Sequence, residues 1–381
     1  MHTVKRVAVL GSTGSIGQQT LDIVRAFPDQ FRVVGLAAGH NVRLLAEQAR
    51  EFRPRMVCCA RGAEAARELG LSKEVAFTPM EEMVKEPDVD LVMVATSGRA
   101  GLVPTLEALK AGRRTVALAD KEAVIMAGEM LMDCVARYNG ILLPVDSEPS
   151  AIWQCLRGEN PAVRRVILTA SGGPFRDRPV EELEQVTPEE ALHHPTWKMG
   201  KKITVDSATL INKAFEVIEI HWLFEVPWER IEVVIHPQSI VHSMVEFADG
   251  SVKAQLSPPD MRLPIQYAML YPKRVANEAI ARLDTSSPTS LDFEPLDRER
   301  YPSFSLALDV ARRGGTYPAV LSAADEVAVE LFLRGQARFT QIARLIERVV
   351  ARHRPVARPT LEEILAADAW AREETLAQLR P

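Results

Sequence analysis

The sequence contains few cysteines and none of the arrangements that give cysteine a structural or redox role. The four are Cys58, Cys59, Cys134 and Cys155 in a chain of 381 residues. No CxxC pair occurs and no spacing suits zinc, so the sequence predicts neither a disulfide framework nor a zinc site. We expect small buried thiols in a reducing compartment.

Long apolar runs and an excess of positive charge are also lacking. No apolar run is long enough to span a bilayer, and a net charge of -5 argues against nucleic acid as a general partner. The first predicted strand begins by Val7, which leaves no room for a signal peptide ahead of it. We therefore expect a cytoplasmic protein, and its length predicts two or three domains.

The first glycine-rich segment, GSTGSIG, follows a short apolar strand (7–10) and precedes a helical pattern (18–27). Strand, glycine loop and helix in this order form the context of a dinucleotide-binding motif, in which the helix N-terminus faces the pyrophosphate. A tight turn between strand and helix is the alternative. The next strand (32–37) ends in AGHN, without an acidic residue to hold a ribose 2′-hydroxyl, which favours NADP over NAD.

Further strands (56–60, 89–96 and 114–118) alternate with helical patterns, which predicts a doubly wound parallel sheet. Ligands bind beside the carboxyl ends of such strands. Lys121 and Glu122 fall in a loop at one of these ends, where a site residue and an ordinary surface charge are equally expected.

The next strand (141–145) runs directly into Asp146-Ser147-Glu148. In an extended chain residues two apart face the same side, so the two carboxylates would point together. Such a pair suits a hard divalent cation, Mg²⁺ or Mn²⁺. The alternative is that Asp146 simply caps a helix predicted over 149–156.

The densest group of reactive side chains lies in HPTWKMGKKITVDSATLINKAFE, residues 194–216. Ser207, or the residue before it, is predicted as a helix N-cap, so that this helix start would suit a phosphate or another anion. Asn212, Lys213 and Glu216 are three or four residues apart and would share one rim of the helix. A capped amphipathic helix with solvated charges is the alternative.

The stretch 174–200 contains four prolines and little continuous apolar pattern. Stretches of this kind in compact domains form lids or are disordered, and we expect one of the two here. Trp197 and Met199 near its end are explained if they close over a ligand.

The remaining chain predicts a second sheet, a linker and a helical bundle. A hairpin turns at Asp249-Gly250, and His236 and His242 are expected to be hydrogen-bonded structural residues. The stretch 271–296, rich in Pro, Ser and Thr, indicates a linker. Three helices are predicted to start near Val320, at Thr340 and at Thr360.

Seven motifs occur in order from the first strand to about Met261: GSTGSIG, LADKEA, LPVDSEPSAI, SGGPF, HPTWKMG, VDSATLINKAFE and HPQSIVHSMVEFADGSVKAQL. Together they resemble the 1-deoxy-D-xylulose-5-phosphate reductoisomerase family, and YPSFSLAL and LSAADEVAV extend the likeness more weakly. The resemblance implies an NADPH-dependent, metal-requiring enzyme. Its reaction converts 1-deoxy-D-xylulose 5-phosphate to 2-C-methyl-D-erythritol 4-phosphate, the committed step of the non-mevalonate route to isoprenoid precursors.

The resemblance also implies which residues form the site. The metal ligands are Asp146, Glu148 and Glu216, and catalytic roles fall to these three with Lys121 and His194. The substrate-binding residues are Ser147, Ser171, His194, Trp197, Ser207, Asn212 and Lys213. The cofactor-binding residues are Thr13, Gly14, Ser15, Ile16, Gly39, His40, Asn41, Asp120, Glu122, Met199 and Met261. The implied cofactors are NADPH and Mg²⁺ or Mn²⁺, with Co²⁺ as a further metal, and the implied partners are the sugar phosphate and a second copy of the chain.

The chain departs from the usual family pattern at a few of these positions. Asp120 stands where Asn is usual and would add negative charge near the nicotinamide ribose. His40 stands where Lys or Arg is frequent and would bind a 2′-phosphate more weakly at high pH. Ser322 and Asp325 replace the usual asparagines in the C-terminal motif.

The expected fold class is α/β, with a Rossmann-type NADP-binding domain (1–145) that contains a doubly wound sheet. A central α+β catalytic and connective domain (146–270) follows, with a lid at about 172–200. The linker (271–296) then leads to a C-terminal α-helical bundle (297–381).

Three other functions fit parts of the sequence. A semialdehyde dehydrogenase would need a nucleophilic cysteine, but Cys155 falls within a predicted helix without a matched histidine. A metal-dependent aldolase or sugar-phosphate isomerase would turn over without NADPH. A non-catalytic NADP-binding sensor would not need three carboxylates. For the family's own reaction, direct migration and retro-aldol cleavage with re-addition both fit this residue set.

Overall fold

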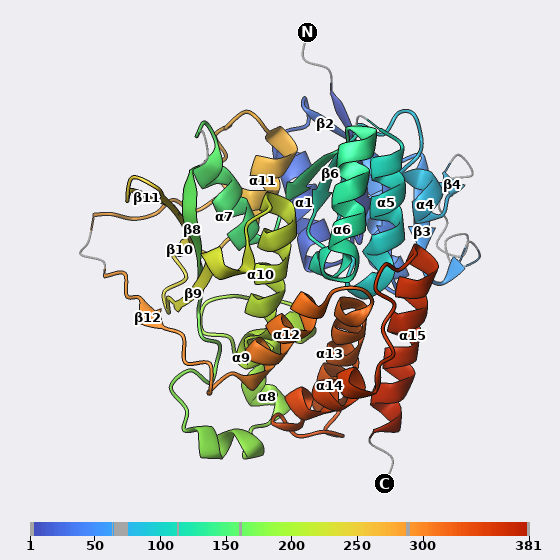
Figure 1. Ribbon diagram of the computed structural model, residues 1–381. Coiled ribbons are helices and arrows are strands. Elements are labelled where there is room, and N and C mark those ends of the chain that lie inside the picture. The colour runs from blue at the N-terminus through green and yellow to red at the C-terminus, as the bar shows by residue number, and fades with distance from the viewer. Residues whose placement is uncertain are drawn as a thin grey trace. The chain divides into compact units, whose positions relative to one another are not determined.

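The computed structural model describes residues 4–62, 64, 75–112, 114–159, 162–286 and 290–378. The described chain divides into two compact units, and many of their elements are labelled in Figure 1. The first unit comprises Met1–Ala123, Glu129–Ser150 and Asp260–Ala281. The second comprises Val124–Gly128, Ala151–Pro259 and Arg282–Pro381.

A parallel sheet forms the centre of the first unit. Its seven strands lie in the order β4-β3-β2-β1-β5-β6-β7, and each neighbouring pair is parallel. The chain runs from β1 outward to β4 and then returns to β5 on the other side of β1, so the winding reverses between β1 and β5. Ligands bind at such a switch point in doubly wound sheets. The strands are β1 (Lys5–Leu10), β2 (Phe31–Ala38), β3 (Met56–Cys59), β4 (Ala76–Phe77), β5 (Leu91–Val94), β6 (Thr115–Leu118) and β7 (Ile141–Pro144).

This sheet confirms the predicted doubly wound domain. Short apolar strands such as β5 are buried along their whole length, as is usual in a parallel sheet. The helices of the unit are α1 (Ser15–Ala26), α2 (Val42–Phe52), α4 (Met80–Met83), α5 (Leu102–Lys110) and α11 (Arg262–Leu270), with the short 3₁₀ helix η1 (Gly98–Gly101). Two more helices, α6 (Lys121–Tyr138) and α7 (Ser147–Leu156), have residues in both units.

The second unit contains a mixed five-stranded sheet in the order β11-β10-β8-β9-β12. Strands β8 and β9 are parallel, whereas β10 pairs antiparallel with β8 and β11. The predicted hairpin at Asp249-Gly250 joins β10 to β11, and Gly250 takes the positive φ that this turn needs. The strands are β8 (Val163–Ala170), β9 (Ile231–Ile235), β10 (Val241–Phe247), β11 (Val252–Leu256) and β12 (Glu294–Pro295).

His236 is a structural histidine, as predicted, and it fixes the connection from β9 to β10. Its Nε2 accepts the backbone N–H groups of Ile240 at 3.2 Å and Val241 at 3.1 Å. Its Nδ1 therefore carries the proton and donates to the carbonyl of Asp292 at 2.8 Å. Between Leu270 and Glu294 the described residues form no helix or strand. Residues 287–289 of the predicted linker lie outside the described residues.

Helices build the rest of the second unit. Segments α8 (Pro188–Ala191), α9 (Lys201–Thr209) and α10 (Ile211–Phe224) follow the 3₁₀ turn η2 (Val180–Gln185), and η3 (Trp228–Arg230) precedes β9. The C-terminal helices, orange to red in Figure 1, are α12 (Pro302–Arg313), α13 (Tyr317–Leu333), α14 (Gln341–Arg352) and α15 (Leu361–Ala377).

The predicted C-terminal bundle is present, but the prediction of three helices was wrong. The first helix, α12, starts with Pro302 at a position where the missing N–H does no harm. It ends before Gly314-Gly315, so the next helix begins at Tyr317 and not near Val320. The predicted capping box at Thr360 is confirmed with Glu363.

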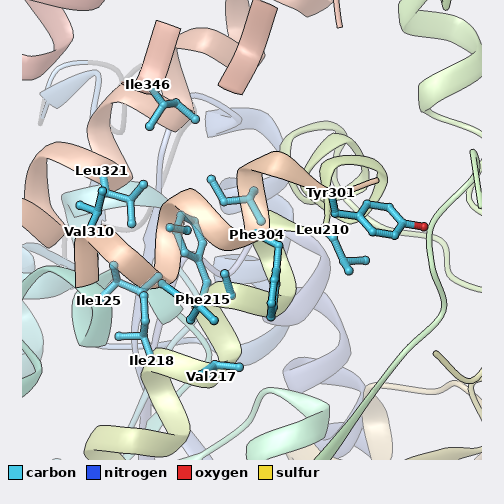
Figure 2. Close-up of a cluster of buried hydrophobic side chains, with 14 of the residues drawn as sticks. Ile125, Leu210, Phe215, Val217, Ile218, Tyr301, Phe304, Val310, Leu321 and Ile346 are labelled. Carbon is cyan, nitrogen blue, oxygen red and sulfur yellow. The ribbon is translucent and has the colours of Figure 1, made fainter. Parts of the chain in front are cut away.

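One apolar cluster forms the core of the second unit (Figure 2). It includes Phe215 of α10, Phe304 of α12 and Leu321 of α13, each at most 1% exposed. Phe175, Leu183 and Ala191, from the predicted lid stretch, also belong to it. The stretch is therefore anchored in the core at these three residues, which argues against the disordered alternative, whereas the lid at about 172–200 stays a prediction.

Among the described residues, no helix combines the length and apolar character needed to cross a membrane. Three of the four cysteines are buried and Cys58 is partly exposed. Burial raises the pKa of the Cys155 thiol to about 11, which makes this residue a poor nucleophile near neutral pH. This observation removes the main support for a cysteine-dependent dehydrogenase.

Asp120 caps α6 from a buried position in the first unit. Only 1% of the residue is exposed. Its Oδ1 accepts the Ala123 N–H at 3.3 Å and its Oδ2 accepts the Thr96 hydroxyl at 2.5 Å. Burial, and then the charge of Glu122, raise the pKa of Asp120 well above its usual value. Asparagine would keep an acceptor at this position without a charge.

We predict that Asp120→Asn stabilises the protein progressively as the pH rises. A group whose pKa is raised by folding contributes stability below its unfolded pKa, and this contribution is lost as the pH increases through the folded pKa. Asparagine does not ionise, so the variant does not lose this stability as the pH rises. Urea unfolding at about pH 5 and about pH 8 should show a larger gain for Asp120→Asn at the higher pH. The exposed Asp133→Asn on the same helix is the matched control, and equal behaviour of the two variants would contradict the assignment.

Candidate functional site

The glycine loop after β1 has the form of a nucleotide-binding turn. Gly11 has a φ of +84°, and a Cβ there would lie 2.2 Å from the Ala95 carbonyl oxygen. A Cβ on Gly17 would lie 2.2 Å from the Gly11 oxygen. These two glycines let strand, loop and helix pack closely, whereas Gly14 is exposed and caps α1 without a side chain. The first turn of α1 contains no acidic residue, so its N–H groups are available to an anion.

The end of β2 lies next to this loop. Gly11 and Ser12 both donate backbone N–H bonds of 2.8 Å to the Ala37 carbonyl. The following residues, including His40, are exposed, and Asn41 caps α2 by accepting the Leu44 N–H. The predicted cofactor residues 13–16 and 39–41 therefore come from neighbouring strand ends of the first sheet, whereas Met261 precedes α11 in the same unit.

The sequence predicted that Lys121 and Glu122 lie in a loop. This prediction was wrong, because they are the first two residues of α6. This position brings Lys121 to the end of β7, where its Nζ lies 2.7 Å from Asp146 Oδ2. Only 7% of the lysine side chain and 14% of the aspartate side chain are exposed. Opposite charges at this distance stabilise each other strongly when they are partly removed from water.

Asp146 and Glu148 are placed by the start of α7 and not by an extended strand. The chain becomes helical at Ser147, so the extended conformation assumed for this pair was wrong, but carboxylate oxygens of Asp146 and Glu148 lie within 4.8 Å of each other, as expected. Asp146 Oδ1 accepts the Ser147 N–H at 3.0 Å, which resembles the predicted cap. The Ser147 hydroxyl donates to Glu148 Oε2 at 2.5 Å. The result is a group of oxygen atoms at a helix start in the first unit.

In the second unit, the loop 171–178 after β8 brings Ser171 to a fixed position. Gly172 and Gly173 have φ values of +84° and +72°, which other residues adopt at a cost. A Cβ on Gly173 would lie 2.5 Å from the Ser207 carbonyl oxygen. The Gly173 N–H also donates to Ser171 Oγ at 3.1 Å. A cavity of about 230 Å³ adjoins this loop and is lined by Ser171, Gly173, Pro174, Arg176, Asp177, Arg178, His193, Pro195 and Pro237.

His194 connects two of the predicted phosphate residues. Its Nε2 lies 3.0 Å from Ser171 Oγ and 3.0 Å from Ser207 Oγ. Its Nδ1 accepts the backbone N–H groups of Thr196 at 3.2 Å and Trp197 at 3.0 Å. The proton of the neutral ring therefore sits on Nε2. Burial lowers the pKa of His194 to about 4, so the ring is a neutral donor at physiological pH.

Ser207 does not begin a helix, and the predicted N-cap was wrong. It lies in the last turn of α9, which starts after Gly200. The residue before it, Asp206, pairs instead with Lys202 one turn earlier, at 2.6 Å. Leu210 takes a left-handed conformation with a φ of +60°, which ends α9 and allows α10 to begin at Ile211. The helix start near Ser207 is therefore that of α10.

The predicted rim on α10 is confirmed, but its charges are buried. Asn212 Nδ2 donates to Glu216 Oε1 at 2.6 Å, and Lys213 Nζ donates to Glu216 Oε2. Lys213 is 5% exposed and Glu216 is 1% exposed. The alternative of solvated surface charges is excluded for these two residues.

A second group of buried charged residues connects α9 with α13. Lys202 Nζ lies 2.8 Å from Asp325 of α13, in addition to its contact with Asp206. Both aspartate side chains are at most 2% exposed. Asp325 thus has a charged partner at a position where the family pattern has asparagine. The structure gives no reason for Ser322, which is 3% exposed.

The segment 194–200 leads from His194 to α9. Trp197 and Met199 are half-buried, and the Trp197 ring lies 5.9 Å from the His242 ring. His242 in turn bonds the Ser257 hydroxyl at 2.9 Å, consistent with its predicted structural role. The segment is also tied by a 3.1 Å contact between the Thr196 and Ser239 hydroxyl groups.

The structure adds two residues that sequence reasoning missed. Tyr301 donates a hydrogen bond of 3.0 Å to the Gly172 carbonyl, and Arg300 donates to the carbonyls of Phe175 and Arg178. Tyr301 begins the YPSFSLAL motif, which does not indicate what it contacts, and Arg300 lies just outside this motif.

The predicted residues thus come from both units. The first unit contains the glycine loop, the end of β2 and the group Lys121, Asp146, Ser147 and Glu148. The second contains Ser171, His194, Trp197, Met199, Ser207, Asn212, Lys213 and Glu216. The first set offers N–H groups, carboxylates, a hydroxyl and an ammonium group, and the second offers hydroxyl, imidazole, amide, ammonium and carboxylate groups.

Family models match nearly the whole chain. Residues 7–128 match the model of 1-deoxy-D-xylulose 5-phosphate reductoisomerase. Residues 142–224 match that of the 1-deoxy-D-xylulose 5-phosphate reductoisomerase C-terminal domain. Residues 256–374 match that of the DXP reductoisomerase C-terminal domain.

Two curated relatives are named 1-deoxy-D-xylulose 5-phosphate reductoisomerase. The protein from Thermomicrobium roseum is 54% identical over 374 residues, which cover 96% of this chain and 95% of the relative. The protein from Pelotomaculum thermopropionicum is 51% identical over 381 residues, which cover 97% of each chain.

Solved structures agree with the sequence comparison. The reductoisomerase from Zymomonas mobilis in complex with NADPH has a TM-score of 0.91 and 39% identity, and the match covers 99% of this chain and 100% of that one. A DOX-P reductoisomerase in complex with NADPH, fosmidomycin and magnesium also has a TM-score of 0.91, with 35% identity and coverage of 99% and 98%. With relatives this similar over nearly its full length, the chain belongs to the 1-deoxy-D-xylulose 5-phosphate reductoisomerase family.

Proposed function

We propose that the protein converts 1-deoxy-D-xylulose 5-phosphate to 2-C-methyl-D-erythritol 4-phosphate with NADPH and a divalent metal ion, the reaction of its family. The observation that carries this proposal is the group around His194, where one neutral imidazole contacts Ser171 and Ser207. A sugar-phosphate enzyme needs such converging donors. The same unit presents Lys213 and Asn212 at the start of the next helix.

Ser171, Ser207, Asn212 and Lys213 are the proposed phosphate ligands. Hydroxyl groups rotate to donate to phosphate oxygens, and Lys213 adds a positive charge. The N–H groups at the start of α10 favour an anion through the helix dipole. Since His194 is neutral, it would act as a hydrogen-bond donor and an orienting group for the two serines, without contributing charge.

Asp146, Glu148 and Glu216 are the proposed metal ligands. All three offer carboxylate oxygens, the donor type that Mg²⁺ and Mn²⁺ prefer. Each already has a defined orientation, set by Lys121 and Ser147 in the first unit and by Lys213 and Asn212 in the second. When bound, the ion would polarise the substrate's carbonyl and neighbouring hydroxyl oxygens as a Lewis acid.

The ion pair between Lys213 and Glu216 links the two proposed sites. Each of the two residues neutralises the other inside an apolar core. A phosphate beside Lys213 would neutralise part of the positive charge of the lysine. More of the negative charge of Glu216 would then be available to a cation. Anion binding and cation binding should therefore strengthen each other.

NADPH is the proposed hydride donor, held by the loop residues Thr13, Gly14, Ser15 and Ile16 and by Gly39, His40 and Asn41. The exposed Gly14 and the uncapped start of α1 fit a pyrophosphate. The neutral and basic residues after β2 fit a 2′-phosphate. We assign the nicotinamide surroundings to Glu122, Met199 and Met261, with Asp120 contributing from its buried position.

The remaining residues would orient the substrate and exclude water. Lys121 is held by Asp146 and would donate to a substrate oxygen, as would the Ser147 hydroxyl. Trp197, with its half-buried ring beside His242, would cover the bound sugar. Excluding water protects the reactive aldehyde until hydride reaches it.

A cytoplasmic location and a homodimer complete the proposal. The edge strand β11 supports the dimer, because its exposed face carries Val252 at 51% and Leu256 at 38% exposure. Apolar side chains on an exposed edge are a common site of association between copies.

The experiment that tests the function measures NADPH oxidation by the purified chain with 1-deoxy-D-xylulose 5-phosphate. After chelation, activity should disappear and should return with Mg²⁺ or Mn²⁺, because the carboxylates require the ion to act on the substrate. Turnover of the sugar phosphate without NADPH would favour an aldolase or isomerase. Binding of NADPH with no turnover under any metal would favour a sensor.

We predict that Glu216→Gln lowers turnover by at least about a hundredfold, the scale on which metal-site substitutions act. Glutamine keeps the size of the side chain but removes the charge, while NADPH binding by the first unit should not change. The matched control is Glu219→Gln on the same helix, which is also buried, at 2% exposure. Thermal unfolding checks that both variants are folded. Equal activity of the two variants would remove Glu216 from the proposed site.

A further inference from the structure

The loop 171–178 is held from two sides within the second unit. On one side, Gly173 approaches the end of α9 so closely that a Cβ would lie 2.5 Å from the Ser207 carbonyl oxygen. On the other side lie Arg300 and Tyr301, immediately before α12. The proposed phosphate ligand Ser171 begins this loop, so whatever holds the loop also sets the position of its hydroxyl.

Tyr301 makes the central contact with this loop. Its hydroxyl donates to the Gly172 carbonyl at 3.0 Å, in a buried environment, and the residue is only 5% exposed. Figure 2 shows the ring at the edge of the apolar cluster, with its hydroxyl oxygen directed away from the other labelled side chains. Burial raises the pKa of the Tyr301 hydroxyl above its usual range, so it remains a donor at neutral pH.

The position of the Gly172 carbonyl affects the orientation of Ser171. Gly172 and Gly173 are consecutive residues with positive φ, a combination that reverses the chain within two residues and directs the carbonyl between them. The next N–H, that of Gly173, donates to Ser171 Oγ. The Tyr301 hydroxyl therefore holds one end of the peptide group whose other end orients Ser171.

Arg300 holds the far part of the same loop. Its guanidinium donates to the carbonyls of Phe175 and Arg178. The ring of Phe175 also packs edge-on against the ring of Phe339, which lies between α13 and α14, with 5.2 Å between the ring centroids. Hydrogen bonds from a charged donor to backbone carbonyls are stronger than neutral ones, so Arg300 limits movement of the loop.

We propose that Tyr301 and Arg300 are positioning residues that set the affinity for the phosphate group of the substrate by fixing Ser171 relative to Ser207 and His194. The proposal rests on the phosphate site proposed above. Neither residue touches the reacting atoms, and the effect of changing either should fall on phosphate binding and not on NADPH.

Tyr301→Phe tests the proposal with little change in packing. The ring also lines a cavity of about 420 Å³, so a smaller residue would enlarge this cavity and confuse the result, whereas phenylalanine removes only the hydroxyl. We expect the KM for 1-deoxy-D-xylulose 5-phosphate and the inhibition constant of inorganic phosphate to rise together by about three- to tenfold, the range of one lost hydrogen bond. The KM for NADPH should stay within about twofold.

Two matched controls accompany the test. Tyr317→Phe makes the same change in α13, where the ring lies 5.3 Å from His353. Arg298→Met, at an exposed position, is the control for Arg300→Met, which gives a second and independent removal of a loop contact. Both loop variants should weaken phosphate inhibition, and both controls should match the wild-type protein.

The proposal is overturned if Tyr301→Phe and Arg300→Met behave as their controls do, or if they change the KM for NADPH as much as that for the sugar phosphate. A wild-type protein that does not oxidise NADPH with the sugar phosphate would instead contradict the proposed function. The two failures are therefore distinguished by the wild-type measurement.

Discussion

A buried ion pair on α10 is the constraint around which the second unit is arranged. Glu216 and Lys213 are nearly inaccessible to water and lie among Ile211, Phe215 and the rest of the apolar core. A carboxylate in such surroundings is tolerated only with a charged and hydrogen-bonded partner. Removing one member of a buried pair costs about 3–5 kcal/mol, so a change in either residue also lowers the stability of the second unit. The proposed phosphate and metal ligands on this helix are thus also residues on which its stability depends.

The neighbouring segments are placed relative to this helix by local conformations. Leu210 in its left-handed conformation separates α9 from α10 and brings Ser207 close to the start of α10. Two glycines with positive φ bring Ser171 beside Ser207, and one neutral histidine contacts both. Together these local conformations bring two hydroxyl groups and an imidazole into contact, close to the start of α10. In the first unit, the glycine loop follows β1, at the point where the winding of the sheet reverses between β1 and β5.

Patterns with a clear local cause could be predicted from the sequence. The glycine loop after β1, the hairpin at Gly250 and the capping box at Thr360 each follow from one rule about turns or caps, and the structure contains them. The rim on α10 also followed from spacing, because residues three or four apart must share a helix face. The family resemblance supplied the roles of these residues, which spacing alone could not do.

Features that depend on contacts distant in sequence could not be predicted. Asp206 looked like a cap, but Lys202 and Asp325 give it a different role. The burial of Phe175 and Leu183 has no period along the chain, so their packing against the core could not be predicted. The contact of Tyr301 with Gly172 joins residues 129 positions apart, and no local signal announces it. Such errors arise because tertiary packing decides between local options of similar energy.

Coupling of cation and phosphate binding through Lys213 and Glu216 is the proposal that joins the two sites. The direct measurement is the affinity for Mn²⁺, determined by electron paramagnetic resonance with and without saturating inorganic phosphate, and with the free ion counted in each sample. The account predicts that phosphate tightens Mn²⁺ binding by about fivefold or more, the usual lower range of coupling between sites. The same affinity for Mn²⁺ in both samples would contradict it.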